Sequence, residues 1–167
     1  MDDDDLLDAA KVGNFQLVTQ LIEAGFDLEA QDEDESTPLI LAARYGHTAC
    51  LQALIDAGAN IEARDNQGFT PMAIAAGNGK AECIRSLFNA GADVEATIHS
   101  GMAGLALAAQ FGHASAAQLM LDLNANIEAV DVEGNNALFY ATARGFSPST
   151  EVLLAANASV NTRNRTQ

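Results

Sequence analysis

Apolar and small residues return along the chain with a period of 33 residues. An aliphatic residue opens each unit, an alanine follows three positions later, and a glycine comes four positions after the alanine. These three registers are Leu6, Leu39, Met72, Leu105 and Leu138; Ala9, Ala42, Ala75, Ala108 and Ala141; and Gly13, Gly46, Gly79, Gly112 and Gly145. Two further apolar registers, which begin at Leu21 and Leu28, keep the same step. Five registers in phase indicate an internal repeat.

The second unit shows the local structure that the pattern predicts. Thr37 is a candidate N-cap, and Pro38 occupies the first helical position, where its missing N–H costs nothing. A short helix over about 38–45 follows, and Gly46 ends it. A second helix over about 48–57 presents apolar residues at helical spacing.

Each helix pair leads into an extended stretch with a turn at its end. After the second pair, Gly58 takes the left-handed position, and residues 65–68 (Asp-Asn-Gln-Gly) predict the tip of a β-hairpin-like loop. A helix pair this short cannot bury its apolar face alone, so neighbouring units must stack. The pattern therefore predicts one domain over residues 1–167. Its repeats are expected at about 1–31, 32–64, 65–97, 98–130 and 131–163.

The motifs within each unit resemble those of a known family. In the second unit these motifs are Thr37-Pro38-Leu39, Ala42-Ala43, Gly46-His47 and Gly58-Ala59-Asn60-Ile61. They resemble the ankyrin repeat, and the resemblance covers nearly the whole chain. It implies an all-α ankyrin-repeat solenoid of stacked helix-turn-helix units with β-hairpin-like loops. It also implies that a partner binds the concave face, which the loop tips and the first helices build.

The fourth unit departs from the family pattern. Ala103-Gly104 replaces Thr-Pro, and Ile98 stands where the turn Asp belongs. Glycine costs a helix roughly 0.5–1 kcal/mol relative to alanine, so we expect the fourth unit to have the least well-formed first helix. Asn124 and Asn157 replace the glycine after the second helix, a substitution that this left-handed position tolerates.

The charge of the chain bears on the kind of partner. Lys and Arg number 8 and Asp and Glu number 23, which gives a net charge of −15. Phosphate backbones and anionic lipid headgroups repel such a chain, so we expect no nucleic-acid and no membrane partner. A protein with a basic surface would be attracted. The alternative is that the charge only keeps an elongated molecule soluble.

The compartment is predicted from three features. The sequence has no run of about 18 apolar residues that would indicate a membrane span. Its acidic start at 2–5 is unlike a basic secretory signal. Cys50 and Cys83 occupy equivalent positions in neighbouring units, too far apart for a disulfide, so we expect buried free thiols. We therefore expect a monomer in the cytoplasm or nucleus. The sequence is compatible with a leader peptide that has been removed. It is also compatible with a longer parent protein, because Asn164 falls in register with Asp131 as if a sixth unit were beginning.

No constellation of residues predicts catalysis. His47 and His113 lie two stacking steps apart, roughly 20 Å, which is too far for a shared metal. One carboxylate also recurs in each unit, at Glu29, Glu62, Glu95 and Glu128. About 10 Å separates these carboxylates, so we interpret them as a solvated edge. We predict no enzyme activity, no cofactor and no metal.

The family resemblance places partner-binding residues near the turn and just before the helix-ending glycine. The predicted residues are Arg44, Tyr45, Arg64, Phe69, His99, Met102, Gln110, Phe111 and Arg144. The four apolar members are expected to form a track across the second to fourth units, and aromatic and Arg side chains are common interface anchors. Alternatively, Phe69 and Phe111 lean inward against neighbouring loops. Arg44 and Arg144 could instead balance local acidity.

Two functions are compatible with these residues. The leading hypothesis is a protein–protein interaction module, an adaptor or stoichiometric inhibitor, that binds its partner on the concave face. The alternative is a regulatory or targeting segment of a longer enzyme or channel.

Overall fold

A computed structural model describes residues 4–160, and within them the chain folds into ten helices joined by turns and loops. Their bounds are α1 (Asp4–Val12), α2 (Phe15–Glu23), α3 (Pro38–Tyr45), α4 (Thr48–Asp56), α5 (Pro71–Gly77), α6 (Ala81–Asn89), α7 (Gly104–Gln110), α8 (Ala114–Asp122), α9 (Ala137–Ala143) and α10 (Ser147–Ala155). Regular strands are absent from this part of the chain, which has one isolated antiparallel bridge, between Thr97 and Ala103. The all-helical solenoid predicted from the sequence is confirmed.

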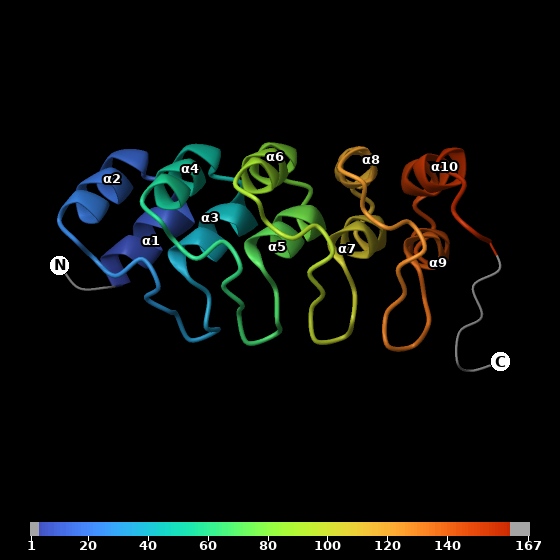
Figure 1. The fold of residues 1–167 in the computed structure, drawn as a ribbon, viewed down its shortest axis with the longest axis horizontal. Helices are drawn as coiled ribbons and strands as arrows, with labels where there is room; N and C mark the ends of the chain where they lie inside the picture. Colours follow the sequence, from blue (N-terminus) through green and yellow to red (C-terminus); the bar gives the residue numbers. More distant parts are fainter. Residues whose placement is uncertain (1–3, 161–167) are drawn as a thin grey trace.

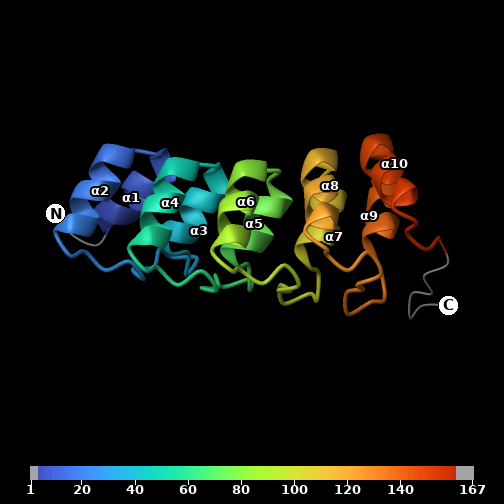
Figure 2. The ribbon, with the colours of Figure 1, turned by 45° about the horizontal axis from the view of Figure 1, so that its top comes forward.

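The helices form two parallel layers in an elongated stack (Figure 1). Helices α1, α3, α5, α7 and α9 contact one another in that order and make the first-helix layer. Helices α2, α4, α6, α8 and α10 make the second-helix layer, and the loops extend beyond the first-helix layer (Figure 2). None of the helices in residues 4–160 is long and apolar enough to cross a bilayer.

The helix ends follow the predicted signals. The hydroxyl oxygens of Thr37 and Thr70 accept the backbone N–H of Ile40 at 3.4 Å and of Ala73 at 3.2 Å. A proline follows each of these N-caps at the start of its helix. Gly46 ends α3 in the left-handed conformation, with φ at 81°. Since these signals recur with the repeat, the same helix pair forms again and again.

Helix α7 is a partial exception to what we expected. Its N-cap, Ala103, has no side-chain hydrogen bond, but α7 has 7 residues, the same length as α5 and α9. The prediction of a poorly formed helix is therefore wrong as to length. Gly104 also has a packing role, because a Cβ there would lie 2.8 Å from Met120 Cε and 3.3 Å from Ala76 Cβ. Its lack of a side chain lets three helices approach closely.

The glycine between the two helices of a pair is covered by a side chain from the next repeat. A Cβ on Gly13 would lie 2.4 Å from the ring of His47, and one on Gly79 would lie 2.7 Å from the ring of His113. The Nε2 atom of His47 also lies 3.1 Å from the carbonyl oxygen of Lys11. Both histidines thus serve packing between repeats, and the glycine register leaves room for them.

The recurring carboxylates link the repeats, so the interpretation as a merely solvated edge is wrong. Each accepts a backbone N–H from the following repeat at 2.7–2.8 Å. The pairs are Glu29 with Asn60, Glu62 with Asp93, Glu95 with Asn126, and Glu128 with Ser159. The side chains of Asn60, Asp93 and Asn126 in turn accept the N–H of the next carboxylate residue at 2.9–3.0 Å. One chain of hydrogen bonds therefore runs across all these repeats.

Candidate functional site

The loop tips are joined to one another by backbone hydrogen bonds. Asn66 N–H donates to Asp34 at 2.9 Å, and His99 N–H donates to Gln67 at 3.1 Å. The N–H of Val132 donates to the carbonyl of Ser100 at 3.1 Å. Four tips thus form one rim beside the first-helix layer. We call the rim and the adjoining first helices the loop face, which corresponds to the concave face expected from the sequence.

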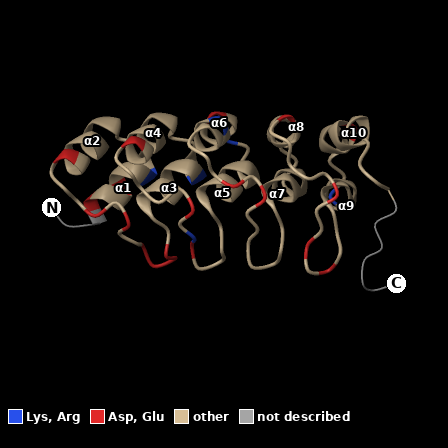
Figure 3. Cartoon of the chain, in the orientation of Figure 1, with Lys and Arg blue, Asp and Glu red and all other residues tan. Residues whose placement is uncertain are grey.

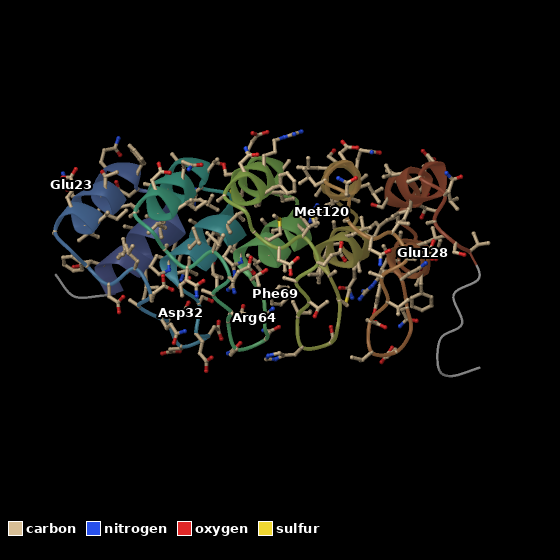
Figure 4. All side chains as sticks on the ribbon, viewed as in Figure 1. Glu23, Asp32, Arg64, Phe69, Met120 and Glu128 are labelled. Atoms are coloured by element: carbon tan, nitrogen blue, oxygen red, sulfur yellow. The ribbon has the colours of Figure 1, made fainter. Side chains whose placement is uncertain are left out.

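A cavity of about 300 Å³ opens on the loop face between the third and fourth repeats. It is lined by Phe69, Ile74, Gly77, Asn78, Phe111 and His113. Phe69 comes from the loop before α5 (Figure 4), and Phe111 directly follows α7. Phe69 is partly buried against the core, whereas Phe111 is 54 % exposed. The structure therefore brings two predicted residues, Phe69 and Phe111, to one apolar cavity.

Gly77 explains why the cavity lies at this place. The equivalent positions in the second, fourth and fifth repeats are Arg44, Gln110 and Ala143. Arg44 reaches across to the next loop and pairs with Asp65 at 3.0 Å. At the following interface Gly77 has no side chain, and Ile98 replaces the aspartate. The ionic link between the second and third repeats is thus replaced, one repeat on, by an apolar opening.

In the other three loops the aspartates, which include Asp32, are held by hydrogen bonds. Asp65 is 4 % exposed and also accepts the N–H groups of Gln67 and Phe69. Asp131 accepts the Tyr140 hydroxyl and two backbone N–H groups. Burial opposes ionisation of Asp131, but these hydrogen bonds outweigh it and lower its pKa. Burial and then the bond to Asp131 raise the pKa of Tyr140 to about 12.

Tyr45 places a second exposed aromatic side chain on the loop face, in the second repeat. It is the last residue of α3, is 44 % exposed, and holds the position equivalent to Phe111. Its ring stacks on His47, with ring centroids 6.3 Å apart and an interplanar angle of 26°. This contact holds the ring in place while one side stays open, the arrangement that favours an interface anchor.

The other predicted residues have different surroundings. Met102 is only 6 % exposed, so its prediction as part of an exposed track is wrong. It belongs to the hydrophobic core. Arg44 donates to Ser36 and Asp65, which supports the alternative that it balances a local charge. Arg144 is exposed at the end of α9, and Gln110 is half-buried.

Arg64 and His99 both hold loops together. Arg64 Nη1 donates to the carbonyl of Gly68 at 3.0 Å and to that of Thr97 at 2.7 Å. The His99 ring lies against Gly68, where a Cβ would come within 2.7 Å of its Cδ2 atom. Both residues are also exposed to solvent.

Acidic residues flank the cavity on two loops (Figure 3). Glu33, Asp34 and Glu35 are exposed at the tip before α3, and Glu133 is exposed at the tip before α9. The two tips between them, 65–68 and 98–101, belong to the two repeats that line the cavity and carry one acidic residue, the paired Asp65. The loop face therefore has an apolar cavity and only one acidic tip residue near its middle, and it carries exposed carboxylates on the tips to either side.

The reactive side chains elsewhere are shielded. Cys50 and Cys83 are free and 1 % exposed, and burial raises the pKa of both thiols. Within residues 4–160 no three His, Cys, Asp or Glu side chains come together as metal ligands.

Stacked helix pairs with one continuous row of loop tips define a helical-repeat solenoid. The family model described as ankyrin repeats (3 copies) matches residues 6–98 and 96–164. The chain therefore belongs to the ankyrin-repeat family. No curated protein matches it. Ankyrin repeats are generally protein–protein interaction modules and are typically not enzymes.

Sequence reasoning missed the residues that make the cavity. It named Phe69 and Phe111 but not Ile74, Gly77 or His113 among the binding residues. The available signal was the break at Gly77 in a register that holds a side chain in the next repeats on either side. An absent side chain is visible only when the repeats are compared position by position.

Proposed function

We propose that this protein binds another protein on the loop face, as an adaptor or as a stoichiometric inhibitor that covers the partner's surface. The observation that carries the proposal is the exposed Phe111 beside an apolar cavity, with the exposed Tyr45 two repeats away in the same register. Aromatic side chains at the centre of a surface supply most of the binding energy in many interfaces.

The charge supports a partner with a basic surface. The chain carries a net charge of −15, and the acidic tips flank the apolar middle of the loop face. Such a field speeds association with a cationic surface and weakens as salt screens it over a Debye length of about 8–10 Å. The buried free thiols suit a reducing compartment, so we place this binding in the cytoplasm or nucleus.

The experiment compares two double variants in affinity capture from lysate at low and moderate salt. Tyr45→Ala/Phe111→Ala removes the exposed aromatics of the loop face. Phe15→Ala/Phe88→Ala removes two aromatics of similar exposure, 41 % and 38 %, from helices of the second-helix layer. We expect the first variant to lose the partner and the second to keep it, and moderate salt to weaken capture by the wild type.

Helical circular dichroism of both variants provides the folding control, since all four side chains are at least a third exposed. A partner that the first variant retains at full strength would place the interface elsewhere. Equal loss in both variants would show that the aromatic residues of the loop face have no special role.

A further inference from the structure

We propose that the cavity at Gly77 takes one bulky aliphatic or aromatic side chain from an extended, cationic segment of the partner. This inference rests on the proposed function and names the chemistry that the loop face recognises. The cavity measures about 300 Å³, and a closed apolar cavity of about 150 Å³ already holds a benzene molecule. One side chain the size of Leu, Met or Phe therefore has room.

The walls of the cavity suit an apolar occupant. Phe69, Ile74 and Phe111 supply most of its apolar surface, Asn78 and His113 supply the polar part of the lining, and Gly77 contributes no side chain. A Cβ at Gly77 would lie 3.6 Å from Leu107 Cβ and 3.9 Å from Phe111, which is ordinary van der Waals contact. A small side chain thus fits at Gly77 without strain, and a longer one would run into the cavity.

The flanking charges indicate which residues surround the anchor, the apolar side chain that enters the cavity. The tip 65–68, which directly precedes the lining residue Phe69, is bonded to the acidic tip at 33–35 through Asn66 and Asp34. The tip 98–101, in the repeat that supplies Phe111, is bonded through Val132 to the tip that carries Glu133. With repeats about 10 Å apart, each acidic tip lies roughly 10–20 Å from the cavity. An extended chain covers that distance in about three to six residues, so Lys or Arg is expected at those offsets from the anchor.

The test is a selection of phage-displayed random twelve-residue peptides on the whole protein. We expect the enriched peptides to share one Leu, Met, Phe or Trp, with Lys or Arg about three to six positions away. A selected peptide, labelled for fluorescence anisotropy, then gives dissociation constants for a set of variants. Burial of one such side chain corresponds to about ten- to a hundredfold in affinity, so Gly77→Met should weaken binding by that factor.

Matched variants separate the cavity from the rest of the surface. Ala143→Met puts the same side chain at the equivalent position two repeats away, where Ala143 is exposed, and should leave the dissociation constant unchanged. Glu33→Gln/Glu35→Gln should weaken binding severalfold at low salt. The same double variant should still bind peptides that carry the apolar anchor residue in preference to peptides that lack it. Gly77→Ala should retain the fold and weaken binding less than Gly77→Met does.

Each contrary result has its own meaning. Peptides that bind Gly77→Met as tightly as wild type, but do not bind Tyr45→Ala/Phe111→Ala, would overturn the cavity proposal and leave the proposed function standing. Peptides that bind every variant equally, or no enriched peptide at all, would count against both. Concentration-dependent self-association that Gly77→Met abolishes would show that a second copy of the chain fills the cavity, which would also overturn the proposal.

Discussion

Replacing Arg44 by Met tests the ionic link between the second and third repeats. The Asp65 side chain is 1 % exposed and the Arg44 side chain is 25 % exposed. Without the guanidinium, the carboxylate keeps only the N–H groups of Gln67 and Phe69 as partners. Breaking a fully buried pair costs about 3–5 kcal/mol, and breaking an exposed one costs about 0–1 kcal/mol. Because Arg44 is partly solvated, we expect Arg44→Met to lower the free energy of unfolding by about 2 kcal/mol.

Urea denaturation followed by circular dichroism measures this change. In thermal denaturation, a loss of about 2 kcal/mol in a chain of this size corresponds to a fall in Tm of about 4–8 °C. The matched control is Arg85→Met, since Arg85 is 58 % exposed and its Nε lies 3.9 Å from Glu82. That control removes the same charge and should stay within about 0.5 kcal/mol of wild type.

A double-mutant cycle with Asp65→Asn isolates the pair, because the asparagine oxygen can still accept both backbone N–H groups. We expect a coupling of at least about 1 kcal/mol between positions 44 and 65. Equal destabilisation by Arg44→Met and Arg85→Met, or a coupling near zero, would refute the assignment of this ion pair as a link between repeats.

Three further substitutions test the packing and the hydrogen bonds. Glu62→Ala leaves a backbone N–H in the next repeat without its acceptor and should cost about 1–2 kcal/mol in urea denaturation. Gly104→Ala should gain nothing or lose up to about 1 kcal/mol, because the new Cβ meets Met120. Tyr140→Phe should cost about 1–3 kcal/mol at neutral pH. The lowered pKa of Asp131 means that its contribution is present above the ordinary value of 3.8 and is lost as the pH falls through the folded-state pKa. Tyr140 has a raised pKa, so its contribution is present below pH 10 and is lost as the pH rises through about 12. Stability curves of wild type and Tyr140→Phe against pH should therefore converge at both extremes.

Each of these substitutions has a control at a position that lacks the contact under test. Glu82→Ala removes an exposed carboxylate, Gly77→Ala adds a Cβ where there is room, and Tyr45→Phe removes the hydroxyl of an exposed ring. Gly77→Ala should stabilise the protein by about 0.5–1 kcal/mol through helix propensity. A variant that matches its own control would show that the contact assigned to it has no energetic role.

The fold was predictable because its signals are local and repeated. Thr37 caps its helix, Pro38 begins it, and Gly46 ends it, and each of these roles depends only on nearby backbone. Stacking then follows, since every unit has the same apolar registers to bury. The recurring carboxylates were visible in the sequence, but their role was not. Their hydrogen bonds reach a backbone N–H 31 residues away, and that distance is set by the stacking of the repeats.

The candidate site was less predictable because it depends on contacts between repeats. Tyr45 and Phe111 were found from their register and are exposed as an anchor requires. Met102 occupies a position that varies between repeats, and its burial becomes visible only in the folded chain. The cavity lies where Gly77 lacks the side chain that Arg44 and Gln110 provide in the repeats on either side. The missing side chain indicates an opening only once the stacking of the repeats is known.

The most direct test of the central claim is site-specific photocrosslinking in cell extract. A photoreactive phenylalanine analogue replaces either Phe111 on the loop face or Phe88 on α6, which are both exposed. The account predicts that the analogue at Phe111 forms a covalent adduct with a partner protein, that Gly77→Met suppresses this adduct, and that the analogue at Phe88 forms none. Adducts from Phe88 alone, or equally from both positions, would contradict the assignment of the loop face as the binding surface.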